Sequence, residues 1–242
     1  MVLLCSTRYL TPVKTFVLFD IDGTLLYSEK VDSRCFANSY ETIFGLPFPT
    51  IDWTQFPEVT DHVIFRTAFK DHFGRFPSET ERVTFEDHYL EGLSTSRVDS
   101  PEEFKEVPGA TDLWRRLDGD DQFLTGIATG GWQRPASIKL EHVGIPPDQP
   151  FAGYANNKFS RVEILSEAIN KARAVHEVDR VIYVGDAIWD VTTTQKMNLP
   201  LIGVRRKGDH DALKQAGADR VITDFTPDSA FFTHITDILQ EG

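Results

Sequence analysis

The stretch Phe16-Val17-Leu18-Phe19-Asp20-Ile21-Asp22-Gly23-Thr24 decides the fold. Its four leading apolar residues predict a short buried strand, which two carboxylates follow one residue apart. Open α/β sheets bind their ligands at the carboxyl ends of their strands, so we expect Asp20 and Asp22 at a ligand site. Like charges this close need a cation or a shared proton. Gly23 permits a turn and Thr24 offers a hydroxyl, although Asp and Gly also occur together in ordinary turns.

Three further polar signatures follow, each at the end of an apolar run or near the start of a helix. The apolar run 123–129 ends in Thr129-Gly130-Gly131, and a basic pair follows at Lys158 and Arg161. The apolar run 181–184 leads into Gly185-Asp186-Ala187-Ile188-Trp189-Asp190. Because these signatures occur in this order and lie at strand or helix ends, together they indicate one shared site far more strongly than any of them does alone.

These motifs resemble those of the haloacid dehalogenase (HAD) superfamily, whose first motif is Asp-x-Asp-Gly-Thr. The resemblance covers most of the chain outside residues 30–104. It implies a Rossmann-like core with a helical cap inserted just after the first motif, as in the phosphoglycolate phosphatase and β-phosphoglucomutase-like subgroup. The dehalogenases of the superfamily lack the second Asp, so Asp22 favours phosphoryl transfer.

Composition narrows the class of protein. The chain has 242 residues, 40% of them apolar, and no run approaches the ~18 apolar residues of a membrane span. The start at 1–5 lacks a basic leader, so we predict no signal peptide, and residues 1–14 are expected to form an irregular lead-in. A net charge of −12 disfavours nucleic acid as a partner. Cys5 and Cys35 form no Cys-x-x-Cys pair, which favours a reducing, cytoplasmic setting.

Residues 27–106 are predicted to form a small all-helical cap domain. Apolar residues recur at helical spacing, and helices are expected near 31–44, 58–73 and 78–92. Ser78 followed by Glu81 three residues later is typical of a capping box at a helix start.

The other segments, 1–26 plus 107–242, are predicted to form the α/β core. Alternating strands and helices indicate a parallel sheet covered by helices on both faces, a Rossmann-like arrangement. The expected strands are 16–19, 123–129, 181–184, 201–204 and 220–222, and the expected helices are 110–117, 133–142, 161–175, 188–197, 210–216 and 227–240.

The resemblance implies a role for each acid of the first motif. Asp20 would be the nucleophile that attacks phosphorus and forms an aspartyl phosphate. Asp22 would be the general acid and base, reaching the leaving-group oxygen and later the attacking water. Gly23 and Thr24, beside these acids, are assigned to substrate binding.

Phosphate binding is assigned to the second and third motifs. Thr129, with the backbone amides of Gly130 and Gly131, could bind phosphoryl oxygens at a helix start, or Thr129 could simply cap the helix. Lys158 and Arg161 compete to stabilise the phosphoryl charge. Family habit favours Lys158 slightly, although a Lys in that motif is often followed by Pro and Lys158 is followed by Phe. Arg161 lies closer to the expected helix start and could bind phosphate through a bidentate fork.

The acids predict a magnesium site. Asp186 and Asp190 are spaced four apart and follow a strand, and with Asp20 they offer the oxygen ligands that Mg²⁺ prefers. The resemblance implies Asp20, the Asp22 backbone carbonyl and Asp186 as direct ligands. Asp190, also assigned to the metal site, would orient a bound water or the basic residue, or could complement the helix dipole.

The predicted function is Mg²⁺-dependent hydrolysis of a small phosphate monoester by a HAD-like phosphatase. A sugar-phosphate mutase of the same fold would use the same motifs, and a non-catalytic phospholigand-binding protein is the alternative from another class. A phosphonatase would need a cap Lys acting as a Schiff base, and Lys30 and Lys70 lie in no such context. The expected partner is a small phosphorylated metabolite, with no nucleic acid and no membrane, and the chain is expected to be a monomer or homodimer.

Overall fold

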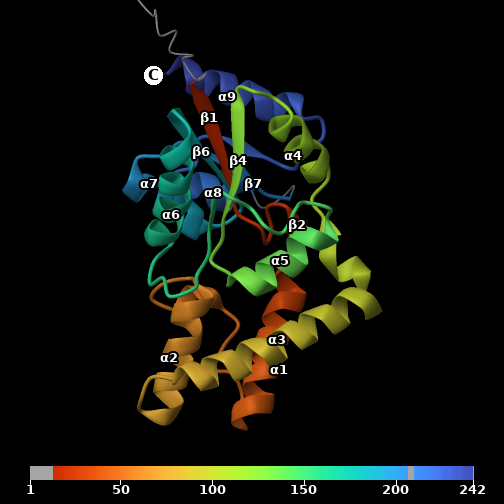
Figure 1. Cartoon of the computed structure of the whole chain (residues 1–242), viewed down its shortest axis with the longest axis vertical. Helices are drawn as coiled ribbons and strands as arrows, with labels where there is room; N and C mark the ends of the chain where they lie inside the picture. Colours follow the sequence, from red (N-terminus) through yellow and green to blue (C-terminus); the bar gives the residue numbers. More distant parts are fainter. Residues whose placement is uncertain (1–12, 207–209, 242) are drawn as a thin grey trace, which may run out of the picture.

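A parallel six-stranded sheet lies in the upper half of Figure 1, which shows the computed structural model; the model describes residues 13–206 and 210–241. The strand order is β5-β4-β1-β6-β7-β8. The strands are β1 (Lys14–Phe19), β4 (Phe123–Ala128), β5 (Ala152–Gly153), β6 (Val178–Gly185), β7 (Leu201–Val204) and β8 (Val221–Ile222). This sheet confirms the α/β prediction. Residues 1–12, which hold Cys5 and most of the predicted lead-in, lie outside the described residues.

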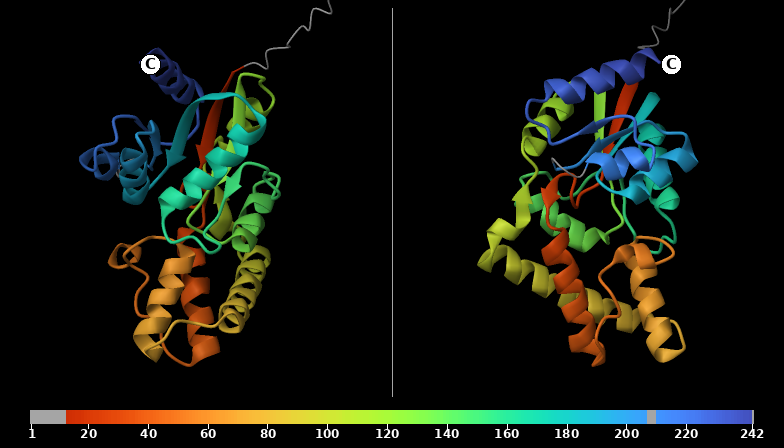
Figure 2. Two further views of the ribbon diagram at one scale, coloured as in Figure 1. Left: turned by 60° about the vertical axis from the view of Figure 1, so that its left-hand side comes forward. Right: turned by 180° about the vertical axis from the view of Figure 1, so that it is seen from behind.

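Helices cover both faces of the sheet, as predicted (Figure 2). The helices that follow residue 106 in the described chain are α4 (Ala110–Asp118), α5 (Gln133–His142), α6 (Arg161–Val175), α7 (Ile188–Met197), α8 (His210–Gln215) and α9 (Ser229–Gln240). On one face, Phe19 of β1 packs against Trp114 of α4 and Phe231 of α9, with ring centroids 5.5 and 6.4 Å away. On the other face, Arg161 of α6 donates a hydrogen bond to the Tyr183 hydroxyl of β6.

The central position of β1 explains its apolar sequence. Its last four residues are buried, because a parallel strand covered on both faces must be apolar on both. Phe19 pairs with Ile127 of β4 and with Val184 of β6. The three strands therefore end at one edge, where the polar residues that follow them come together.

A block of three longer helices is inserted between β1 and α4 and lies at the carboxyl edge of the sheet (lower part of Figure 1). These are α1 (Glu29–Phe44), α2 (Asp61–Phe73) and α3 (Glu79–Asp99), with short 3-10 turns at Trp53–Gln55 and Pro101–Phe104. The chain enters and leaves this insertion through β2 (Leu26–Tyr27) and β3 (Lys105–Glu106), which pair with each other.

The packing of the insertion follows from its aromatic residues. Phe36, Phe65 and Phe85 are buried, and the ring of Phe85 contacts the other two rings. The ring centroids of Phe65 and Phe85 lie 4.6 Å apart. The predicted capping box of Ser78 and Glu81 starts α3, which runs beyond the expected end at residue 92. No helix in the described ranges combines the length and the apolar composition needed to cross a bilayer.

Candidate active site

A cavity of about 310 Å³ lies where the carboxyl edge of the sheet meets the helical insertion. The ends of β1, β4 and β6 supply one wall, and α1, α2 and the turn before α2 supply the other. Most of the residues predicted for the site line it together: Asp20, Asp22, Thr129, Gly130, Gly131, Arg161 and Asp186. Three strands thus bring motifs more than a hundred residues apart in the sequence to one cavity.

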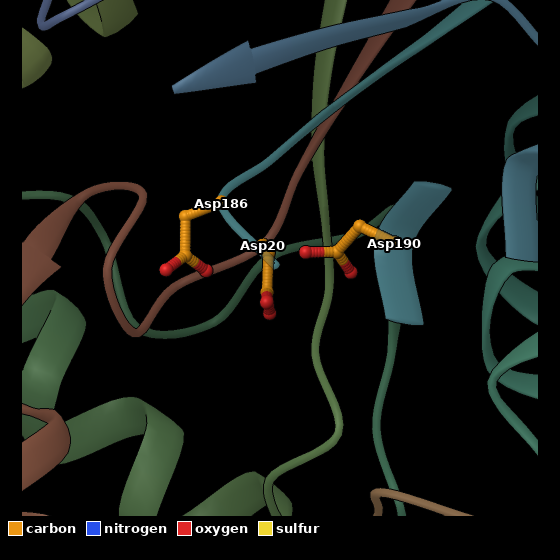
Figure 3. A group of neighbouring side chains, drawn as sticks. All are labelled: Asp20, Asp186 and Asp190. Carbon is orange, nitrogen blue, oxygen red and sulfur yellow. The ribbon is translucent and has the colours of Figure 1, made fainter. Parts of the chain in front are cut away.

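Asp20 lies at the centre of the site, directly after β1, with Asp186 and Asp190 on either side (Figure 3). Its Oδ2 accepts a hydrogen bond from Arg161 (3.2 Å). Its Oδ1 is buried and has no hydrogen-bond partner among the described residues. A buried carboxylate oxygen without a partner is costly, so this atom points to a ligand that the protein would bind there.

Asp20, Asp186 and Asp190 each place one carboxylate oxygen within 4.8 Å of the others. Burial raises the pKa of Asp20 to about 7. The positive charge of Arg161 opposes this rise, and the negative charge of Asp190 adds to it. Burial and the charges of Asp190 and Asp20 also raise the pKa of Asp186 well above its usual range. A cation would relieve both effects, so this all-oxygen group fits a hard metal ion.

Within this group the two later acids differ. Asp190 is fully buried and its oxygens already have partners, Arg161 (2.6 Å) and the backbone N–H of Ala187 (3.0 Å). Asp186 lines the cavity, and its nearest cation, Arg205, is 3.8 Å away. Asp186 therefore has the freer oxygens, whereas Asp190 holds Arg161.

Of the predicted basic pair, Arg161 lines the cavity and Lys158 does not. The Arg161 guanidinium is buried and contacts Asp20, Asp190 and the Tyr183 hydroxyl, which in turn donates to the Ala128 carbonyl (2.9 Å). Lys158 lies outside the cavity and pairs with Glu167 (3.0 Å) on the surface of α6. The preference for Lys158 is therefore corrected. Helix α6 begins at Arg161, with Ser160 as its N-cap, and this start directs Arg161 to the sheet edge.

The loop after β4 lines the cavity beside Asp20. Thr129 is buried, and its Oγ1 accepts a hydrogen bond from the Gly131 N–H (3.2 Å). This amide is thus engaged within the loop, while the Thr129 hydroxyl keeps its own proton to donate. A Cβ on Gly130 would lie 2.6 Å from Arg161 Nη1 and 2.6 Å from the Val59 carbonyl. Glycine at this position therefore allows Arg161 and the insertion to meet the loop.

Gly23 and Thr24, predicted to bind substrate, do not line this cavity. Gly23 adopts φ +79°, and a Cβ there would lie 2.2 Å from Asp186 Oδ2. Gly23 therefore has a structural role: glycine adopts this backbone conformation without strain, and its missing side chain leaves room for Asp186. Thr24 is fully buried, and its hydroxyl has no partner in the described part of the chain.

The residues that surround Asp22 were not among those predicted for the site. Its Oδ2 pairs with Lys139 of α5 (2.7 Å), and its Oδ1 accepts a hydrogen bond from the Ser28 hydroxyl. Lys139 also pairs with Asp32 of α1, which accepts a hydrogen bond from Tyr89. A signal for Lys139 does exist, because it falls on the buried stripe of α5 that holds Ala136 and Leu140.

A second unforeseen residue, Asp61, joins the insertion to the loop after β4. Its N–H donates to the Gly130 carbonyl (2.8 Å), and its Oδ2 accepts from the Trp132 N–H (2.8 Å). Burial, with the charge of Asp32, raises the pKa of Asp61 to about 8. The start of α2 is therefore hydrogen-bonded directly to the glycine loop beside Asp20.

A comparison with known protein families agrees with this fold and site. The model of the haloacid dehalogenase-like hydrolase family matches residues 17–204, and the chain belongs to that family. A search of curated proteins finds no match.

Solved structures share the fold at low identity. A candidate β-phosphoglucomutase from Bacteroides vulgatus is 16% identical, with TM-score 0.68 over 94% of this chain and 90% of that one. A hydrolase from Pseudomonas syringae is 20% identical, with TM-score 0.64 over 87% and 94%. A protein from Haemophilus somnus described as a predicted phosphoglycolate phosphatase is 13% identical, with TM-score 0.60 over 92% and 98%.

Proposed function

We propose that this protein hydrolyses a small phosphate monoester through an aspartyl phosphate on Asp20, with Mg²⁺ bound beside it. The observation that carries the proposal is the convergence on one cavity of Asp20, the buried Arg161 and the Thr129 loop. A carboxylate, a cation and a hydroxyl donor around one small space suit a phosphoryl group, whose charge must be held during transfer.

The reaction would take two steps. In the first, an Asp20 oxygen attacks phosphorus in line, the P–O bond to the leaving group breaks, and Asp22 protonates the departing oxygen. In the second, Asp22 removes a proton from water, the water oxygen attacks the same phosphorus, and the bond to Asp20 breaks to release inorganic phosphate. Arg161 and Thr129 would hold the phosphoryl oxygens throughout.

Asp20 and Asp186 would bind the metal ion, with the Asp22 backbone carbonyl as a further ligand, while Asp190 positions Arg161. Mg²⁺ bound there would supply positive charge that offsets repulsion between Asp20 and the substrate dianion. The unpartnered Oδ1 of Asp20 supports this assignment. Residues 27–106 would act as a cap that shields the reaction from bulk water.

The decisive experiment compares phosphate release from p-nitrophenyl phosphate by the wild type and by Asp20→Asn, with and without Mg²⁺. We expect turnover that needs both Asp20 and the metal. Asp112→Asn is the matched control, because the side chain of Asp112 is 88% exposed on α4. Turnover that survives Asp20→Asn would contradict the covalent mechanism.

A mutase would use the same cavity and return the phosphoryl group to a second hydroxyl instead of water. The two activities separate cleanly in an assay with and without an added sugar phosphate. Release of inorganic phosphate without the acceptor supports the hydrolase, whereas transfer to the acceptor without release supports the mutase.

A further inference from the structure

We infer that Lys139 is a positioning residue for the reaction: its ammonium holds the Asp22 carboxylate in place and is itself anchored by Asp32 of the insertion. The inference rests on the proposed function, in which Asp22 transfers protons to the leaving group and from water. Lys139 belongs to none of the motifs that define the site, and its place follows from the geometry alone.

The contacts of Lys139 leave it little freedom. The residue is 2% exposed, on the face of α5 that is turned toward the cavity and the insertion. Its Nζ lies 2.7 Å from Asp22 Oδ2 and pairs on its other side with Asp32. Each acid has one further donor, Ser28 for Asp22 and Tyr89 for Asp32. The ammonium is therefore held from two sides.

The same contacts restrain Asp22. Two donors from different elements, Ser28 and Lys139, occupy its two carboxylate oxygens. An Asp carboxylate otherwise turns readily, because the torsion that ends in it is broad. Proton transfer needs the carboxylate within hydrogen-bond reach of the reacting oxygen, so an angular restraint of this kind bears on rate.

Charge also favours a positioning role over simple packing. The wall around Lys139 includes Asp22, Asp32, Asp61 and Glu29, all carboxylates. Without the ammonium, Asp22 and Asp32 would face one another across the cavity wall with no cation between them, and repulsion would turn Asp22 away. Arg161 contacts Asp20 and Asp190 instead and cannot replace Lys139 at Asp22.

Lys139→Met tests the inference, since Met retains the length and apolar stem of Lys. Two substrates are compared: p-nitrophenyl phosphate, whose leaving group departs as a stable anion, and 2-hydroxyethyl phosphate, whose alkoxide needs a proton. The esters are compared by kcat/KM, which reports formation of the aspartyl phosphate and not the attack of water that both esters share. We expect kcat/KM for the alkyl ester to fall on the order of 10²-fold, and kcat/KM for the aryl ester to fall less than about tenfold. Asp32→Asn, which removes one anchor of Lys139, is expected to give a smaller loss with the same selectivity.

Each other result overturns the inference. An equal loss of kcat/KM on both esters would indicate a structural role, and a rise in KM at constant kcat for both esters would make Lys139 a substrate ligand. Circular dichroism checks that Lys139→Met folds, and Lys139→Gln, which retains a donor, replaces it if it does not. A wild type that hydrolyses neither ester contradicts the proposed function and this inference with it. A wild type that hydrolyses both, with a Lys139→Met variant that loses both equally, contradicts only the role of Lys139.

Discussion

Arg161 donates to Asp190 across a distance of 2.6 Å, and both side chains are buried beneath the cavity. The same nitrogen of Arg161 reaches Asp20 at 3.2 Å. The pair is thus a fixed part of the site and not a surface ion pair, so its removal should affect both stability and activity.

Arg161→Met is expected to lower kcat by about 10²–10³-fold, because a cation aimed at the phosphoryl group is lost. It should also destabilise the fold by about 3–5 kcal/mol, since the charge on Asp190 is left buried with no cation beside it. Lys158→Met is the matched control three residues away, where stability should change by less than about 0.5 kcal/mol. Steady-state kinetics and urea unfolding measure both effects. A larger kinetic loss in the Lys158 variant would reverse the assignment.

Asp186→Asn is expected to abolish most of the stabilisation that Mg²⁺ gives the wild type. A ligand at 100 times its Kd stabilises a protein by about 2.7 kcal/mol, or several degrees in Tm for a chain of this size. Without Mg²⁺ the variant should be at least as stable as the wild type, because neutralising Asp186 relieves repulsion from Asp190 and Asp20. Thermal unfolding with and without Mg²⁺ tests this, with Asp112→Asn as control. An unchanged Mg²⁺ response would remove Asp186 from the ligands.

Asp61→Asn is expected to flatten the dependence of stability on pH. The folded pKa of Asp61 is raised from 3.8 to about 8, so the folded state retains a proton that the unfolded state has lost. This residue should therefore make the wild type less stable as the pH rises from about 4 to about 8. Asn retains the acceptor for Trp132 without the charge. Tm values at pH 5 and pH 8 should differ less in the variant. Asp71→Asn, an exposed acid on the same helix, should keep the wild-type slope, and identical slopes in all three proteins would contradict the prediction.

The cavity should discriminate against a second negative charge on the substrate. The insertion contributes the acids Glu29 and Asp32 to the lining, and none of the Lys or Arg residues at 27–106, all of which are described, lines it. A charge about 7 Å from one carboxylate is repelled by about 2 kcal/mol at an effective dielectric constant of 20. We expect kcat/KM for 2-hydroxyethyl phosphate to exceed that for its carboxylate counterpart, phosphoglycolate, by at least about tenfold. Preference for phosphoglycolate would contradict this reading of the cavity.

The sequence predicted the parts of the site that follow strands. Asp20, Thr129 and Asp186 each come directly after an apolar run, and parallel strands end at one edge. Lys139 was not predicted, although it falls on the apolar stripe of α5, because a single Lys on a helix is usually solvated. The packing of α5 against the insertion buries it. Whether the chain acts in the cytoplasm stays a prediction.

The choice between Lys158 and Arg161 was open in the sequence, although a deciding pattern was present. Ser160 and Glu163 form a capping box, which fixes the first residue of α6 and hence the direction of Arg161. The strands β2, β3 and β5 have two residues each, too few to show any periodicity. Their pairing depends on tertiary contacts, so local pattern could not predict them.

The chain enters the helical insertion at Leu26–Tyr27 and leaves it at Lys105–Glu106, and these two segments pair side by side. The core therefore meets the insertion at neighbouring points on one edge, and the register of β1 with β4 and β6 does not depend on the length of chain between them. During divergence, such a junction would let the helical block be lengthened, shortened or exchanged as a unit. Selectivity for new substrates could then evolve while the chemistry proposed for Asp20 is inherited unchanged.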